Sequence, residues 1–461
     1  MSEAAVAIKR IFVANRGEIA LRVIRAARAL GIESVLGISA ADQGGIPAGE
    51  ATRTVLLGPA PARDSYLNTS LIMHAATATG CNLLHPGYGF LSERPELAEL
   101  CEEASIGFVG PTARSIRQIG DKLSAREVAR AANVPTTSGS KKIDDVGAAL
   151  AVAAQIGYPV ITKASAGGGG RGMMVAANAK ELSDCFEIAA TTAREAFGDG
   201  TLYLERYVEV ARHIEVQILG NGMGGALHFG ERDCSIQRRY QKMIEEAPAQ
   251  ILPAQVRRRL HSCAVDLLSS IRYRNAGTVE FLYDVAGQEF FFMEVNARIQ
   301  VEHPVSEAIT GNNLVEMQIQ MAEGTLGEVS QSDVSFHGHA IEVRILAEDP
   351  MRDFAPSPGQ ITRWDAPVGS GVRVDCAVGE GTLVSPYYDS MVAKLIVRAD
   401  TREQAIELLA QALGTFSVEG IATNIPLLRF IVDHADYRAN RTNTRWLEDV
   451  LLPAFRTYQG S

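Results

Sequence analysis

The sequence predicts a multidomain protein of the α/β and α+β classes, with a doubly wound parallel sheet in its N-terminal part. Its 461 residues exceed what one ordinary hydrophobic core organises, and this length indicates about two to four domains. Up to about residue 115, short apolar runs alternate with amphipathic segments, the pattern of a parallel sheet flanked by helices. The pattern changes at Asp121, and a third unit begins near residue 330. We therefore expect three closely associated domains, 1–120, 121–330 and 331–461, with a mobile lid at about 137–207.

The N-terminal part contains four short apolar runs that are expected to form strands, at 11–14, 34–38, 82–84 and 107–109. Helical periodicity indicates helices at 22–30, 71–79 and 97–103. Turn-forming residues follow two of the strands, at 15–17 and in the His-Pro-Gly-Tyr-Gly segment 85–89. Because ligands of doubly wound sheets gather at the carboxyl ends of the strands, both turns are candidate site segments.

The middle and C-terminal parts mix strands and helices. A helix is expected at 122–132, and a strand at 158–163 leads into a run of glycines. Two-residue alternation predicts further strands, at 213–219, 278–283, 289–295, 339–346 and 390–397. A helix at 402–413 follows the last of them. Such a mixture is typical of α+β domains.

Composition and charge exclude several classes of function. With 46% hydrophobic and 21% charged residues the chain is a globular protein, and its net charge of −10 argues against a nucleic-acid partner. The six cysteines have neither metal-ligand nor redox spacing, so reduced thiols are expected. The N-terminus resembles no signal or transit peptide, and no apolar stretch approaches the length needed to span a membrane. We expect a cytoplasmic protein without a membrane partner.

The glycine run, Ala-Gly-Gly-Gly-Gly-Arg-Gly at 166–172, follows a strand that ends at Lys163. Consecutive glycines let backbone N–H groups approach phosphate oxygens. No Gly-Lys-Ser/Thr follows, and the next residues continue as a strand, so neither a Walker A loop nor a Rossmann fingerprint is present. The run predicts a phosphate site under a strand–glycine–strand flap, and a flexible loop without a ligand is the alternative.

Three polar residues, Glu280, Glu294 and Asn296, are expected on one face of a β-hairpin. A hairpin folded about Gly287 places Glu280 directly opposite Glu294, with Asn296 two residues further along the same face. Like charges directly opposite each other destabilise a sheet, and a divalent metal relieves this. Mg²⁺ prefers such oxygen ligands together with nucleotide phosphates. The alternatives are a solvated pair or a different hairpin register.

Two neighbouring segments add polar groups. If the segment after Asn296 stays extended, Arg298, Gln300 and Glu302 share a face, which suits the binding and deprotonation of a small oxyanion such as bicarbonate. A surface salt bridge is the alternative. The strand at 213–219 carries His213, Glu215 and Gln217 on its polar face, which solvent would ordinarily cover, and the basic segment 237–242 is expected to be a loop.

Taken together, these segments resemble the biotin carboxylase family of ATP-grasp enzymes. The order of the matching stretches over most of the chain is far more specific than any one of them. They lie at 14–20, 85–93, 163–173, 231–235, 245–248, 294–304, 338–344, 386–391 and 418–424.

The resemblance implies a Rossmann-like N-terminal domain, a central ATP-grasp domain with a glycine-rich lid, and an α+β C-terminal domain. It also implies an ATP site in which two lysines and lid glycines contact the phosphates, while other residues line the adenine and ribose. By position these are Lys122, Lys163, Gly169, Gly170, Glu205, Arg206, Tyr207, Val208, His213 and Gln237. Glu280, Glu294 and Asn296 correspond to ligands of Mg²⁺ or Mn²⁺.

The resemblance further implies a bicarbonate and biotin pocket, whose residues are Lys242, Arg298, Gln300, Val301, Glu302, Arg344 and Tyr88. Catalytic roles fall on Arg298, Glu302, Lys242 and Arg344, with Glu302 as the base on bicarbonate and Arg344 beside the biotin ring. ATP would phosphorylate bicarbonate to carboxyphosphate, which then carboxylates biotin. Tyr240 stands where many family members have histidine, so altered ATP affinity is expected.

The same resemblance implies partners. No Met-Lys-Met motif for biotin attachment occurs in the sequence, so we expect the biotin on a carrier protein or on a further C-terminal part, together with a carboxyltransferase that selects the final acceptor. A homodimer is expected as well. The alternatives are another ATP-grasp ligase, which the contexts 85–93 and 338–344 disfavour, and an idle nucleotide-binding homologue, which the retained lysines, acids and arginines disfavour.

Overall fold

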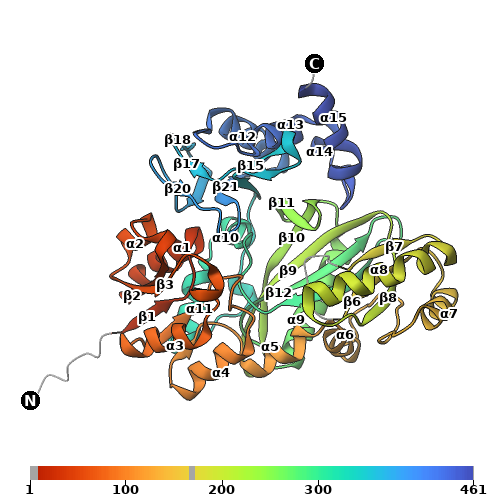
Figure 1. Ribbon diagram of the computed structural model, residues 1–461, viewed down its shortest axis with the longest axis horizontal. Coiled ribbons are helices and arrows are strands. Elements are labelled where there is room, and N and C mark those ends of the chain that lie inside the picture. Colours follow the sequence, from red (N-terminus) through yellow and green to blue (C-terminus); the bar gives the residue numbers. More distant parts are fainter. Residues whose placement is uncertain (1–8, 166–171, 460–461) are drawn as a thin grey trace, which may run out of the picture.

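The computed structural model describes residues 9–165 and 172–459 (Figure 1). Its N-terminal domain contains a five-stranded parallel sheet in the order β3-β2-β1-β4-β5. These strands are β1 (Arg10–Val13), β2 (Glu33–Ser39), β3 (Arg53–Gly58), β4 (Leu83–His85) and β5 (Gly107–Phe108). The predicted doubly wound sheet is confirmed, and β3 is an additional edge strand.

Helices cover both faces of this sheet because its side chains alternate between the faces. Phe12 packs in the core that contains residues of α3 (Thr69–Ala78) and α4 (Pro95–Glu103), whereas Ile11 and Val13 pack with residues of α1 (Gly17–Ala29) and α11 (Leu314–Glu323). The helices are α1 (Gly17–Ala29), α2 (Ile46–Glu50), α3 (Thr69–Ala78), α4 (Pro95–Glu103) and α5 (Ala113–Gly120). Helix α1 starts directly after β1, so its first turn lies at the edge where ligands of such sheets bind.

The central sheet has eight antiparallel strands in the order β13-β12-β9-β10-β11-β14-β21-β19. They are β9 (Ala211–Asn221), β10 (Ala226–Arg238), β11 (Gln241–Ala247), β12 (Arg274–Asp284), β13 (Glu289–Asn296), β14 (His339–Leu346), β19 (Val372–Cys376) and β21 (Met391–Ala399). The pairing of β11 with β14 carries the sheet across residue 330, so the middle and last parts of the chain share one backbone ladder.

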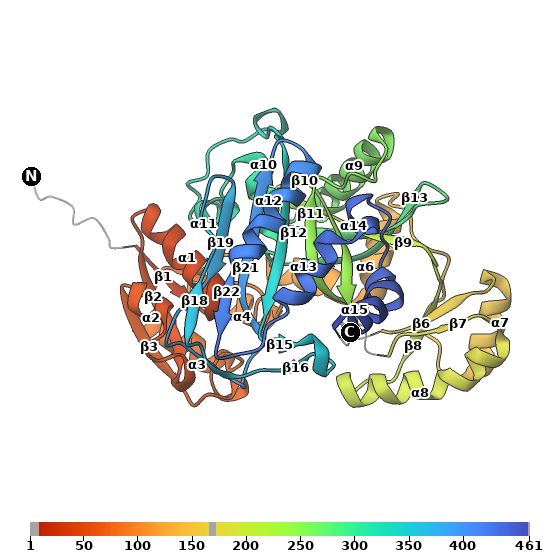
Figure 2. The same cartoon turned by 90° about the horizontal axis from the view of Figure 1, so that it is seen from above.

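The segment predicted to be the lid forms a separate lobe at the right of Figures 1 and 2, called the lid lobe or lid below. A three-stranded antiparallel sheet, in the order β7-β6-β8, packs with two helices around its own apolar core. The elements are α7 (Val146–Ile156), β6 (Val160–Ala164), β7 (Met174–Ala176), α8 (Ala179–Phe197) and β8 (Leu202–Arg206). Residues 166–171, which include four glycines of the glycine run, lie outside the described residues.

Further helices surround the sheets. They are α6 (Lys122–Ala131), α9 (Ala254–Ser270), α10 (His303–Thr310), α11 (Leu314–Glu323), α12 (Arg402–Thr415), α13 (Ile425–Asp433), α14 (Ala435–Arg438) and α15 (Leu452–Gln459). Three small two-stranded ladders join β15 (Glu348–Asp349) to β16 (Ala355–Pro356), β17 (Gly359–Gln360) to β20 (Leu383–Val384), and β18 (Arg363–Asp365) to β22 (Ser417–Glu419). Within the described ranges, no helix has both the length and the apolar character needed to cross a membrane.

Candidate active site

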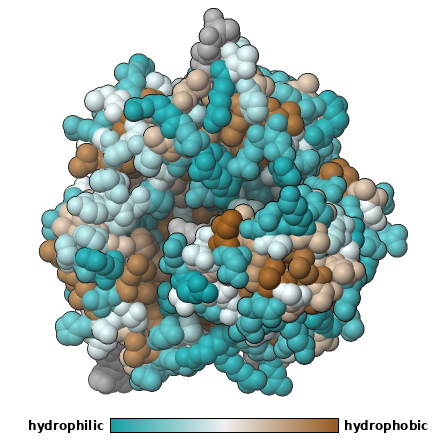
Figure 3. All heavy atoms as spheres, turned by 45° about the vertical axis from the view of Figure 1, so that its right-hand side comes forward, coloured by the Kyte–Doolittle hydropathy of each residue, from teal (hydrophilic) through white to brown (hydrophobic). Residues whose placement is uncertain are grey.

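A cavity of about 1350 Å³ lies between the lid, the central sheet and the C-terminal part of the chain. The space-filling view shows a deep hollow across one face of the molecule (Figure 3). Most of the residues predicted for the site line this cavity. They are Tyr88, Lys122, Lys163, Glu205, Arg206, Tyr207, Val208, His213, Gln237, Lys242, Glu280, Glu294, Asn296, Arg298, Gln300, Val301 and Arg344. Gly169 and Gly170 lie outside the described residues. Glu302 does not line the cavity and lies behind residues that do.

The β12–β13 hairpin pairs Glu280 with Glu294 as predicted, but its strands next to the turn are offset by one residue from the register predicted about Gly287. Glu280 is the Cα partner of Glu294, and Thr278 is the partner of Asn296, with one irregularity between Glu280 and Phe281. The side chain of Glu294 is 34% exposed, whereas that of Glu280 is 6% exposed. The two acids therefore differ in environment, and a solvated pair is excluded as the explanation for Glu280.

Lys242, His213 and the side-chain amides of Asn296 and Gln300 surround Glu280. Lys242 Nζ donates to Glu280 Oε1 (3.0 Å), Asn296 Nδ2 donates to the same oxygen (2.8 Å), and His213 Nε2 lies 3.0 Å from Oε2. Burial alone would raise the pKa of Glu280, but Lys242 and His213 outweigh burial and hold that pKa well below its ordinary value. Glu280 is thus ionised while it is buried.

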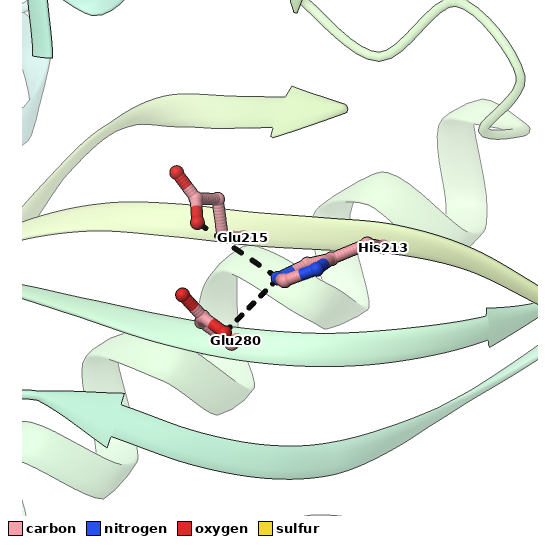
Figure 4. Close-up of side chains that lie close together, drawn as sticks. All are labelled: His213, Glu215 and Glu280. Carbon is pink, nitrogen blue, oxygen red and sulfur yellow. Dashed lines mark ion pairs between the residues drawn. The ribbon is translucent and has the colours of Figure 1, made fainter. Parts of the chain in front are cut away.

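The polar face of β9 is buried instead of solvated. Figure 4 shows the His213 imidazole pointing toward the carboxylates of Glu215 and Glu280, which come from the adjacent strands β9 and β12. Ligand atoms of the three residues lie within 4.8 Å of one another. Burial lowers the pKa of His213, but Glu280 and Glu215 together outweigh burial, so the net shift is upward.

Lys242 connects three buried carboxylates. Its ammonium donates to Glu215 (2.5 Å), Glu280 (3.0 Å) and Glu302 (2.8 Å). Burial disfavours the charged amine, but these three acids raise the pKa of Lys242 well above its ordinary value. Lys242 is therefore a fixed cation at the floor of the cavity.

The prediction of a loop at 237–242 is wrong. The segment is a tight hairpin, in which Gln237 pairs with Lys242 across the end of β10 and the start of β11. Arg239 and Tyr240 form its two-residue turn with φ angles of +47° and +65°. Positive φ at both turn residues belongs to a type I′ turn, which matches the twist of the strands even though neither residue is glycine. The hairpin directs Lys242 inward and leaves Tyr240 at the rim of the cavity.

The segment after β13 bends at 297–298 and does not continue the strand. Arg298 donates to Gln300 Oε1 (2.7 Å) and to Asn296 Oδ1 (3.2 Å), so the predicted proximity of Arg298 and Gln300 is confirmed. The expectation that Glu302 shares their face is wrong, because the chain turns at 301–302 into α10, whose first turn contains Pro304.

Glu302 lies beneath the cavity floor. Its fully buried carboxylate accepts hydrogen bonds from Lys242 (2.8 Å) and Arg344 (3.0 Å). Burial would raise the pKa of Glu302, yet Lys242, Arg344 and Arg232 hold it well below the ordinary value. The carboxylate is therefore ionised and shielded by its two cationic neighbours.

Two residues predicted near biotin come from opposite sides of the cavity. Arg344, on β14, donates to Glu245 (2.7 Å) and to Glu302 (3.0 Å). Tyr88, in the turn after β4, donates its hydroxyl to Glu18. Burial and Glu18 together raise the pKa of Tyr88 well above its ordinary value, so the phenol stays neutral.

The phosphate-binding lysines predicted from the sequence have carboxylate partners. Lys163 Nζ donates to Glu205 Oε2 (2.9 Å), and Lys122 lies 3.6 Å from Glu294 Oε2. Glu205 also pairs with Arg126 of α6, so its buried side chain lies between the lid lobe and α6. Both ammonium groups nevertheless border the cavity.

Sequence reasoning missed several residues of the site. Glu93 accepts from the backbone N–H of Ala297 (2.9 Å) and from Arg298 Nε (3.1 Å), although it lies in a stretch that matched the family. The cavity is also lined by Thr444, Arg445, Glu448 and Asp449. No local pattern marks this C-terminal segment, because only the tertiary fold brings it to the cavity.

Three family models match consecutive parts of the chain. The model "Biotin carboxylase, N-terminal domain" matches residues 7–116, "Carbamoyl-phosphate synthase L chain, ATP binding domain" matches 121–328, and "Biotin carboxylase C-terminal domain" matches 342–449. Together these matches cover most of the sequence.

Curated proteins and solved structures agree with the family models. Biotin carboxylase 1 of Bacillus subtilis is 47% identical over 442 residues, 96% of this chain and 98% of that protein. The mitochondrial methylcrotonoyl-CoA carboxylase subunit alpha of Glycine max is 44% identical over 443 residues, 96% of this chain but 61% of that subunit. The biotin carboxylase domain dimer of Hydrogenobacter thermophilus 2-oxoglutarate carboxylase, in complex with MgADP and bicarbonate, has a TM-score of 0.93 and 45% identity, covering 97% of this chain and 98% of that one.

The fold, the cavity and the similarities agree over nearly the whole length of the sequence. The parallel N-terminal sheet, the lid and the acid-bearing hairpin occur in the order that the family motifs predict. Identity with full-length relatives is far above the level at which only a fold is shared. The chain belongs to the biotin carboxylase family.

Proposed function

We propose that this protein uses ATP and bicarbonate to carboxylate biotin attached to a carrier protein or domain, by way of carboxyphosphate. The observation that carries the proposal is the floor of the cavity. There Lys242, Arg298 and Gln300 surround a space beside the acids of the β12–β13 hairpin. Bicarbonate is a poor electrophile because its charge is delocalised, and phosphorylation by ATP activates it.

Lys122 and Lys163 are proposed to bind the ATP phosphates. Their ammonium groups reach the cavity from the body and from the lid, so a polyphosphate between them is neutralised from two sides. Both have carboxylate partners, Glu294 and Glu205, which keep the ammonium groups oriented before the nucleotide binds. The backbone of 205–208, with His213 and Gln237, is proposed to bind the adenosine.

Glu280, Glu294 and Asn296 fit a hard divalent cation such as Mg²⁺ or Mn²⁺. Their oxygen donors are of the preferred kind, and Glu294 is open to the cavity on the side of Lys122. A cation held there would neutralise charge on the nucleotide phosphates. Asn296 also contacts Glu280 and Arg298, which links the metal site to the anion pocket.

Lys242, Arg298, Gln300 and the backbone of Val301 are proposed to bind bicarbonate. Arg298 is aimed by hydrogen bonds to neighbouring side chains, and its planar guanidinium suits bidentate binding of a small oxyanion. Glu302 is ionised, as a base on bicarbonate must be. Since Glu302 lies behind Lys242 and Arg344, it reaches the bicarbonate proton only if these cations shift onto the substrate.

Arg344 is proposed to stabilise negative charge on the ureido oxygen of biotin, with Tyr88 beside the ring. The biotin would be supplied by a carrier and its carboxyl group consumed by a carboxyltransferase, as separate subunits or as parts of a longer chain. The Glycine max relative, of which this chain spans about three-fifths, supports the second arrangement. We further propose that the protein forms a homodimer, because the Hydrogenobacter thermophilus domain is described as a dimer. We also propose that it is located in the cytoplasm.

The proposed function is tested by ADP release with Mg²⁺ present. We expect hydrolysis of ATP to require bicarbonate and to accelerate on addition of free biotin. Arg298→Met is expected to lower turnover about 100- to 1000-fold, the effect of removing a donor at a developing charge, with ADP affinity by calorimetry near that of the wild type. No ADP release with all substrates would refute the proposal. ADP affinity that falls in step with turnover would refute the placement of Arg298.

A further inference from the structure

Lys394 is a buried cation that none of the matched motifs contains. It lies on β21 directly opposite Arg344 of β14, so the two side chains share one face of the central sheet. Its side chain is 0% exposed, and it does not line the cavity. An ammonium group in this position must be paired, because burying an isolated charge costs many kcal/mol.

The ammonium of Lys394 joins all three parts of the chain. It donates to the carbonyl oxygen of Val301 (2.9 Å) and lies 3.1 Å from Glu18 Oε1 and 3.9 Å from Asp375 Oδ2. Val301 belongs to the turn before α10, Glu18 to the first turn of α1, and Asp375 to β19. Burial alone would lower the pKa of Lys394, but Glu18 and other acids raise it, so the side chain is charged.

The two nearest partners of Lys394, Val301 and Glu18, connect it to residues that line the cavity. Val301 itself lines the cavity beside Gln300. Glu18 accepts the hydroxyl of Tyr88, which lines the cavity from the N-terminal domain. The Lys394 ammonium therefore holds the turn at Val301, beside the proposed bicarbonate pocket. Through the Glu18 carboxylate it also holds the Tyr88 phenol, beside the proposed biotin site.

We propose that Lys394 is a positioning residue of the carboxylation reaction: its ammonium holds the Val301 carbonyl and the Glu18 carboxylate, and so sets the distance between the bicarbonate pocket and Tyr88. The inference rests on the function proposed above. Transfer of a carboxyl group between two substrates depends steeply on how closely their sites are aligned, and displacements of about 1 Å cost about 100-fold in rate. A contact that spans both sites is placed to control that alignment.

Replacement of Lys394 by methionine keeps the length of the side chain but removes its donors and charge. The Val301 carbonyl and the Glu18 carboxylate then lose their shared partner inside the protein, and both walls are released. Replacement of Glu18 by glutamine leaves the hydrogen bond from Lys394 to Val301 in place and weakens the contacts of residue 18 with Lys394 and Tyr88. Comparison of the two variants therefore separates the effect of losing the Val301 contact from the effect of losing the connection to Tyr88.

The experiment measures KM for ATP, bicarbonate and free biotin in the full chain. We expect Lys394→Met to raise KM for bicarbonate and for biotin about 10- to 100-fold, the range produced by the loss of a charge-assisted hydrogen bond, with KM for ATP unchanged. Glu18→Gln is expected to raise KM for biotin alone. Arg402→Met is the matched control, because Arg402 is another buried cation of the C-terminal part, paired with Glu246 away from the cavity.

The outcomes are distinct. If the wild type hydrolyses ATP without bicarbonate dependence, the proposed function fails. If the wild type behaves as expected but Lys394→Met changes all three KM values equally, or behaves like Arg402→Met, Lys394 has a structural role only and the inference is wrong. Should Lys394→Met not fold, Glu18→Gln decides: an unchanged KM for biotin would overturn the connection through Tyr88.

Discussion

Glu280 and Glu294 are chemically identical and directly paired, yet their neighbours give them different properties. Glu280 is buried against Lys242 and His213, which keep it ionised, whereas Glu294 is open to the cavity with Lys122 3.6 Å away. An acid that is already compensated contributes less to recruiting a cation than one that is not. We therefore infer that replacement of Glu294 perturbs the fold less than replacement of Glu280, but weakens metal binding more.

The first prediction concerns Glu294→Gln. We expect the concentration of Mg²⁺ that gives half-maximal activity to rise at least about tenfold, because one anionic ligand is lost while the fold is retained. Glu289→Gln is the matched control, since Glu289 is exposed at the other end of β13. A magnesium titration identical to that of the wild type would contradict the assignment.

The second prediction concerns Glu245, a buried acid that accepts from Arg344. Burial raises the pKa of Glu245 from 4.5 to about 7 in the folded protein. The folded state therefore holds a proton that the unfolded state releases at lower pH, so the free energy of unfolding falls as pH rises from about 4.5 to about 7, by on the order of 3 kcal/mol.

Denaturant unfolding at a series of pH values measures this effect. Glu245→Gln keeps an oxygen acceptor for Arg344 but cannot ionise, so its free energy of unfolding should decline less over that pH interval. Groups distant from Glu245 titrate equally in both proteins, so the difference between the two curves reports on Glu245 and its direct neighbours. Parallel curves would show that Glu245 does not titrate in this interval.

At the scale of single elements, strand alternation and pairing could be read from the sequence. Counting residues to Gly287 predicts the pairing of Glu280 with Glu294. The strands next to the turn are nevertheless offset by one residue from that count, and the irregularity between Glu280 and Phe281 restores the predicted pairing. The same reasoning failed at Glu302, where the chain leaves the extended conformation for α10. It failed again at 237–242, because Arg239 and Tyr240 adopt positive φ without a glycine to signal the turn.

The third prediction uses this turn. Tyr240→Gly is expected to increase the free energy of unfolding by about 1 kcal/mol, because glycine adopts the observed φ of +65° without steric cost. The same change removes an aromatic side chain from the rim of the cavity, so KM for ATP should rise severalfold. Tyr240→Phe is the control that keeps the ring. A loss of stability in Tyr240→Gly, or an unchanged KM for ATP, would contradict this account of the turn.

At the scale of the whole molecule, the sequence indicates three parts but not how they are joined. The ladder between β11 and β14 pairs residues that are nearly a hundred positions apart, Ile244 with Val343 and Ala247 with Ala340. No local pattern specifies such a partner. The same long-range assembly places Arg344 in the wall of the cavity, near the residues predicted to bind bicarbonate, with Lys394 next to it on the neighbouring strand. It also brings residues 444–449 to the part of the cavity proposed to bind the nucleotide.

The fourth prediction follows from the shared sheet. A fragment that ends at residue 330 loses β14, β21 and β19, and leaves β11 as an uncovered edge beside a buried charged cluster. We expect this fragment to aggregate or to remain unfolded, as judged by size-exclusion chromatography and circular dichroism. A soluble, cooperatively unfolding fragment would show that the C-terminal part is an independent domain.

The central claim is that the two facing acids of the β12–β13 hairpin form the metal site of a nucleotide cavity that adjoins an arginine–lysine pocket for bicarbonate. A crystal structure of the protein with a non-hydrolysable ATP analogue, Mg²⁺ and bicarbonate tests it most directly. We predict metal density in contact with Glu280 and Glu294, adjacent to the terminal phosphates, and bicarbonate against Arg298 and Lys242. Nucleotide bound in the cavity with both acids remote from any metal or phosphate would contradict the claim.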